Sequence, residues 1–184
     1  SRLETVLERA KELIDRIRKL LEDVRRKVKE LIDRIRRLNE EANRESEELI
    51  RRIEEELRKG KDAEEVVREV KERLERLLRR SEEVSKKSRK DLEDLVREAE
   101  KVIRDLARLL REVVREVEEV VRRDNTEDAR RILEEVRKLV KELEEELRRA
   151  LKEVRDLAKE VDEDSKRALD RNEKLIRDLD RKVE

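Results

Sequence analysis

Apolar residues recur along this chain at spacings of three and four, which places them on one face of an α-helix. The segment 12–18, with the sequence ELIDRIR, returns at 30–36, displaced by 18 residues, and more loosely from Glu48. Such a repeat equals five turns at about 3.6 residues per turn, the natural pitch of an α-helix. It therefore predicts nearly straight helices, whereas a strict heptad would impose a left-handed supercoil.

Two short breaks divide this pattern into three segments. Gly60 suits the left-handed position just past a helix end, and Asp62 with Glu65 forms a capping box for the next helix. In the second break, Asn125 suits the same left-handed position and Thr126 can cap the helix that follows. The predicted helices cover about residues 2–58, 63–122 and 127–183.

Short connections make sequential helices antiparallel neighbours. Apolar residues fill roughly three of every seven positions, which is the width of the face that a helical bundle buries. We therefore predict an all-α fold, a long, nearly straight, antiparallel up-down-up three-helix bundle that forms a single domain over residues 1–184. Each helix would be about 85–90 Å long at 1.5 Å per residue.

A set of polar residues interrupts the apolar face. Most of them stand where other copies of the repeat have an apolar residue, and the rest stand directly beside such a position. When the chain is folded about its two breaks, Asn39 comes level with Ser81, and Ser85 lies near Ser165. The whole set then falls in one central layer contributed by all three helices. Its members are Asn39, Asn43, Ser46, Ser81, Ser85, Ser88, Ser165 and Asn172.

Three interpretations of this layer are open. The favoured one is a buried hydrogen-bond network, in which Asn amides and Ser hydroxyls satisfy one another across helices. In the second, the Ser residues bond to carbonyls of their own helix and the Asn residues sit in water at the rim. The third is a functional site, such as a hydrated section, a cavity or a place for a partner. A network would fix register, because an unpaired buried polar group costs about 1–3 kcal/mol.

Composition narrows the classes of partner. Charged residues make up 59% of the chain, aromatic residues 0%, and Lys plus Arg equals Asp plus Glu at 54 each. Because the two signs alternate finely, no basic stripe is available for phosphates, and we expect no nucleic-acid partner. No apolar run approaches the roughly 20 residues of a membrane span, and the first residues lack a signal-peptide core. We expect a soluble chain without membrane association or a targeting signal.

The sequence carries no motif for catalysis or cofactor binding. A nucleophilic Ser needs a neighbouring base, and this chain has no His. Metal sites in helical bundles combine inward-facing Glu with His, and Asp and Glu alone are too frequent here to single out any pair. We therefore expect no enzymatic activity, no catalytic residues, no metal site and no cofactor.

Several features together resemble computationally designed helical bundles. They are the restricted set of residue types, the 18-residue core period, the Ser/Asn layer, and the capping boxes at Ser1 with Glu4 and at Asp62 with Glu65. The closest type is the straight three-helix bundle with a core hydrogen-bond network, and the resemblance in style covers the whole chain. It implies a single-state, very stable scaffold with no natural substrate, produced by recombinant expression.

Two functional hypotheses follow. In the first, the protein is a structural scaffold or rigid rod, a monomer that requires no partner, with its register set by the central Ser/Asn layer. In the second, it is a helical interaction module whose apolar face exceeds what three helices bury, so that it binds a partner helix or self-associates. Such a surplus would appear at positions that flank the main core: Leu7, Leu21, Val66, Val84, Leu109 and Leu139.

Overall fold

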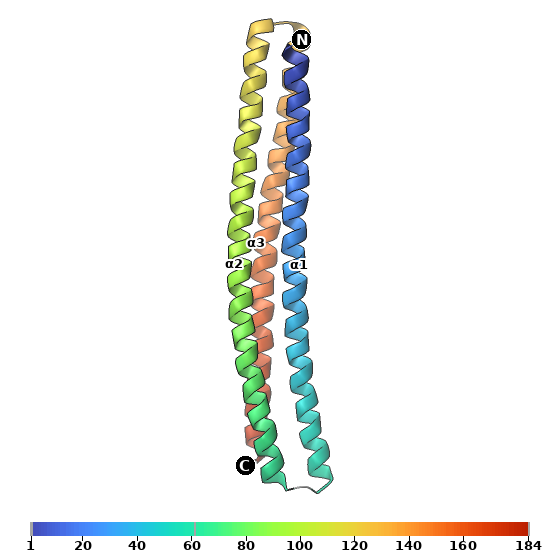
Figure 1. Ribbon diagram of the computed structural model, residues 1–184, viewed down its shortest axis with the longest axis vertical. Coiled ribbons are helices and arrows are strands. Elements are labelled where there is room, and N and C mark those ends of the chain that lie inside the picture. The colour runs from blue at the N-terminus through green and yellow to red at the C-terminus, as the bar shows by residue number, and fades with distance from the viewer. Residues whose placement is uncertain (1, 61, 184) are drawn as a thin grey trace. The chain divides into compact units, whose positions relative to one another are not determined.

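The computed structural model describes residues 2–60 and 62–183, without the side chains of Ala63, Leu179, Asp180, Lys182 and Val183. Three helices account for nearly all of this chain (Figure 1): α1 (Arg2–Arg58), α2 (Ala63–Asp124) and α3 (Glu127–Val183). The predicted all-α, three-helix fold is confirmed. The predicted boundaries hold closely, except that α2 continues to Asp124 instead of ending at 122.

The two breaks have the predicted conformations. Gly60 and Asn125 both adopt positive φ, at 78° and 39°, as expected for the left-handed residue past a helix end. The Asp62 carboxylate accepts a hydrogen bond from the Glu64 backbone N–H at 3.3 Å, and the Thr126 hydroxyl accepts one from the third residue of α3 at 3.2 Å. Both caps are therefore formed. The cap predicted at Ser1 lies outside the described residues.

Packing separates the chain into two compact units, each with a segment of all three helices. Unit 1 comprises Ser1–Lys29 and Asp94–Asp156, and unit 2 comprises Glu30–Glu93 and Leu157–Glu184. Unit 1 thus contains the connection between α2 and α3, and unit 2 the connection between α1 and α2. That the whole chain forms a single domain stays a prediction.

Unit 1 has an apolar core to which each helix contributes. Among the described residues of this unit, every buried side chain is aliphatic, including the fully covered Ile17 of α1, Leu110 of α2 and Leu143 of α3. On its surface, Arg137 pairs with Glu118 and Arg155 pairs with Glu100, both at 3.0 Å. As α3 advances by one 18-residue repeat, its partner on α2 moves back by one repeat. The two helices are therefore antiparallel, and the repeat spaces their contacts.

Unit 2 has a smaller apolar cluster and a polar section. The cluster is formed by Ile53 of α1 with Val67, Val70 and Leu74 of α2, and Ile176 of α3 packs against it. The buried polar residues of the described chain, Ser46, Ser165 and Asn172, all belong to this unit. The same helices therefore build two interiors of different chemistry.

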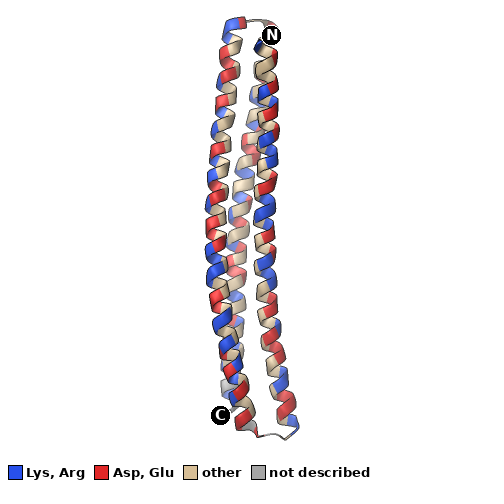
Figure 2. Ribbon diagram, in the orientation of Figure 1, with Lys and Arg blue, Asp and Glu red and all other residues tan. Residues whose placement is uncertain are grey.

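Charged side chains of both signs are interspersed along all three helices (Figure 2). Six ion pairs between helices have one partner in α3: Arg25–Glu153, Glu118–Arg137 and Glu100–Arg155 in unit 1, and Arg36–Glu160, Glu47–Arg171 and Arg89–Asp162 in unit 2. Each pair is partly exposed to water, so we assign it only about 0–1 kcal/mol. In the described part of unit 1, no ion pair joins residues 6–29 of α1 to residues 94–124 of α2. In the described part of unit 2, none joins residues 30–53 of α1 to residues 72–93 of α2. The seam between α1 and α2 thus differs from the two seams that involve α3.

Candidate functional site

The eight polar residues singled out by the repeat all lie in unit 2, at different depths. Ser46, Ser165 and Asn172 are buried. The remaining five are half-buried: Asn39, Asn43, Ser81, Ser85 and Ser88. The layer is therefore deepest on α1 and α3, and all of its α2 members are partly exposed.

One hydrogen bond joins two members of the layer across helices. The amide nitrogen Nδ2 of Asn39 in α1 donates to the hydroxyl oxygen Oγ of Ser165 in α3, at 3.0 Å. Asn39 points inward because it occupies the repeat position of Leu21, which is itself buried. This bond is one link of the predicted network, and the network of all eight residues stays a prediction.

The other deep members make different contacts. The Ser46 hydroxyl donates to the backbone oxygen of Ala42, four residues earlier in the same helix, at 3.0 Å. This is the local bond that Ser commonly makes within a helix. The side-chain oxygens Oδ1 of Asn43 and Asn172 are buried without a hydrogen-bond partner in the described structure. Each such oxygen costs about 1–3 kcal/mol unless it is solvated.

The serines on α2 are open to water. Within the described part of the chain, Ser81, Ser85 and Ser88 donate no hydrogen bond from their hydroxyls to another residue. The buried side-chain atoms without a partner are those of Asn43 and Asn172, so the three hydroxyls reach the solvent. The α2 side of the layer is therefore partly exposed and makes no side-chain hydrogen bond to the rest of the layer.

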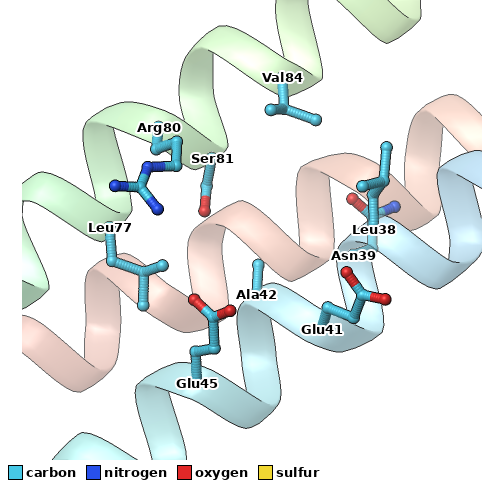
Figure 3. A pocket seen from close by; sticks show the side chains of 9 residues that line it. All are labelled: Leu38, Asn39, Glu41, Ala42, Glu45, Leu77, Arg80, Ser81 and Val84. Atoms are coloured by element: carbon cyan, nitrogen blue, oxygen red, sulfur yellow. The ribbon is translucent and has the colours of Figure 1, made fainter.

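A hollow of about 120 Å³ opens beside Ser81, between α1 and α2. Figure 3 shows Ser81 and Val84 on α2 facing Ala42 and Leu38 on α1 across it. Its wall also includes Asn39, Glu41, Glu45, Leu77 and Arg80. The hollow is thus apolar on two sides, polar at Ser81 and Asn39, and edged by charges.

A second hollow of unit 2, of about 310 Å³, opens between α1 and α3. Its wall is mostly charged or amide-bearing: Arg36, Asn39, Glu40, Asn43, Asp164, Arg167, Ala168 and Arg171. Charged groups from both helices surround this surface depression. The two hollows flank the Asn39–Ser165 bond from different sides.

The flanking apolar positions are mostly covered. Leu21 and Val66 are buried, and Leu7, Val84 and Leu139 are half-buried. Among these six predicted positions, only Leu109 is exposed, by 37%. Most of the apolar residues that were expected to remain outside the core are therefore packed within the two units.

Three other leucines, which the sequence pattern did not single out as surface positions, are also exposed. Leu20 and Leu38 are 44% and 36% exposed, and Leu57, near the end of α1, is 40% exposed. Leu20 and Leu38 are one 18-residue repeat apart, so they lie on the same face of α1. That spacing was the signal that could have identified them.

No group of three or more His, Cys, Asp or Glu side chains is arranged to hold a metal ion within the described part of the chain. None of the described helices has a stretch both long enough and apolar enough to cross a bilayer.

Comparisons with known proteins give a likeness to solved structures alone. No protein-family model matches the chain, and no curated protein matches it. Among solved structures, it is similar to a computationally designed three-helix bundle, at 23% sequence identity, over 99% of this chain and 87% of that chain, with a TM-score of 0.49. A TM-score of this size carries no argument about function, which rests on the residues of the chain itself.

Proposed function

We propose that this chain is a structural scaffold or rigid rod without a natural biochemical activity, and that its polar layer sets the register of its helices. The observation that carries the proposal is the 3.0 Å hydrogen bond from Asn39 in α1 to Ser165 in α3. It is a specific inward contact between two helices whose other buried side chains are aliphatic except for Ser46 and Asn172. The unbroken helices of 57, 62 and 57 residues support the same role.

A repetitive core needs such a device. If α3 moved along α1 by one repeat, most aliphatic residues would meet equivalent aliphatic residues, and little apolar contact would be lost. Asn39, however, would then face Leu147, which stands one repeat before Ser165 and offers no side-chain acceptor. An unpaired buried amide costs about 1–3 kcal/mol, and the half-buried Asn39 amide costs less, so the bond favours the observed register by at most that amount.

The test is a distance measurement between spin labels on α1 and α3. The chain has no Cys, so labels can be attached at Glu48→Cys and Lys174→Cys, two exposed positions of unit 2. The parent protein should give one distance distribution. Replacing both bonding residues, with Asn39→Leu and Ser165→Val, should add a second population shifted along the helix axis by roughly 27 Å, the rise of one repeat.

A matched control changes core shape without changing polarity. Ile35→Leu with Val161→Ile, both at buried positions of α1 and α3, should keep a single distribution. A single, unchanged distribution in the Asn39→Leu/Ser165→Val variant would show that aliphatic packing alone selects the register, and would overturn the proposed role of the layer.

A further inference from the structure

The seam between α1 and α2 in unit 2 is a groove that the chain leaves open. Its apolar wall is formed by Leu38 and Ala42 on α1 and by Leu77 and Val84 on α2. The hollow exists because Ala42 and Ser81 are short. Ala42 occupies the repeat position that holds Val6 and Val24 earlier in α1, so a larger side chain would fill this space.

The charges along this groove have no ion-pair partner. Glu41 and Glu45 edge it on α1 and Arg80 edges it on α2, and none of the three forms an ion pair within the described structure. The seams that involve α3 are bridged by ion pairs, such as Arg36–Glu160 and Arg89–Asp162 in the same unit. In the described part of unit 2, the α1–α2 seam combines an exposed leucine, a hollow and charges without an ion pair at its edges.

We propose that this groove is a docking site for an amphipathic helix of another protein, with a Leu or Ile side chain of that helix inserted beside Ala42 and Ser81. A helix laid against two antiparallel helices buries its apolar stripe in the groove between them. An apolar cavity of about 150 Å³ accepts benzene, so a hollow of about 120 Å³ accepts the branched end of an aliphatic side chain.

The edge charges define the flanks of the docking helix. Lys or Arg is required on the flank that lies over Glu41 and Glu45, and Asp or Glu on the flank over Arg80. A second copy of this chain is a poorer occupant. If two copies met groove to groove about a two-fold axis parallel to the helices, hollow would face hollow and both would stay unfilled.

The probe is a synthetic helical peptide with a leucine stripe, Lys along one flank and Glu along the other. It is titrated calorimetrically into the full chain, and we expect saturable binding of one peptide per chain. Leu38→Glu, which puts a charge on the wall, and Ala42→Leu, which fills the hollow, should each weaken binding roughly tenfold or more. A peptide with Glu on both flanks should bind more weakly, because Glu41 and Glu45 repel it.

Leu109→Glu is the matched control, because Leu109 is 37% exposed, almost as much as Leu38, but lies in unit 1. It should leave the affinity unchanged. Circular dichroism establishes that each variant is folded, and Leu38→Glu alters a side chain that already reaches water. Absence of saturable binding, or equal weakening by Leu109→Glu, would overturn the proposal.

Light scattering of the chain alone tests whether a second copy of the chain occupies the groove. A dimer that Leu38→Glu converts to a monomer would assign the groove to a second copy and overturn docking of a different helix. This proposal goes beyond the scaffold role and does not depend on it. Loss of peptide binding leaves the spin-label distances unchanged, so the two proposals fail independently.

Discussion

Units 1 and 2 are built from the same helices and the same 18-residue repeat, yet their interiors differ. Among the described residues, unit 1 buries aliphatic side chains alone, whereas unit 2 also buries Ser46, Ser165 and Asn172. Aliphatic contacts are strong but nearly equivalent after a shift of one repeat. Polar contacts add less stability, but they are satisfied in only one arrangement. Under the proposed role of the polar layer, a periodic core obtains stability from one section of its helices and a unique register from another.

The largest expected effect compares a core leucine from each unit. Leu110 in unit 1 and Leu74 in unit 2 are 0% and 1% exposed, and replacing either by Ala should cost about 2–5 kcal/mol of unfolding free energy. We expect Leu110→Ala to cost more, because it leaves a cavity inside the larger, fully aliphatic cluster. Leu74 belongs to a smaller cluster that can relax. Chemical denaturation measures both. A larger loss for Leu74→Ala would mean that the polar unit is the better packed one.

The next prediction concerns two substitutions that place a polar residue in the interior of unit 1 and an apolar residue in the interior of unit 2. Asn172 in unit 2 and Val154 in unit 1 occupy the same repeat position of α3, and both are buried. Val154→Asn should destabilise the protein by about 1–3 kcal/mol, because it buries an amide among aliphatic side chains. Asn172→Leu should stabilise it by about 1 kcal/mol, because it removes the unpaired buried Oδ1 of this residue.

Melting temperatures of the two variants should therefore move in opposite directions. A loss of stability on Asn172→Leu would indicate that water or another polar group satisfies that oxygen. It would then favour the network interpretation of the layer. The same variant should keep its full helical signal in circular dichroism.

The smallest expected change in stability concerns the two connections between helices, in which different residue types adopt positive φ. Gly60→Ala should cost about 1 kcal/mol through backbone strain alone, because no atom lies within 4 Å of an added Cβ. Gly60→Asn should cost less, since Asn tolerates this conformation and already adopts it at position 125. Thermal unfolding of the two variants measures the difference. Equal costs would indicate that the connection changes its backbone conformation on substitution.

Helix ends and caps were predictable because their signals are local. Gly60, Asp62, Asn125 and Thr126 behave as their residue types and positions indicate, and the one boundary that moved is the end of α2 at Asp124. The layer was predictable only as a set of positions. Ser85 was expected near Ser165, whereas the hydrogen bond of Ser165 comes from Asn39. Partner choice depends on side-chain geometry to within a fraction of an ångström, which a count along the chain does not resolve.

By itself, the sequence determined three helices, their ends, their antiparallel order and the positions at which polar residues interrupt the apolar face. It did so because a period of 3.6 residues assigns each position to a face, and because capping uses residues adjacent in the chain. Only the tertiary structure decided that Asn39 bonds Ser165, that Ser81 lies half-buried beside a hollow, and that Glu41, Glu45 and Arg80 along that hollow form no ion pair with other described residues. Those outcomes depend on how far apart two helices pack and on which side chains meet between them.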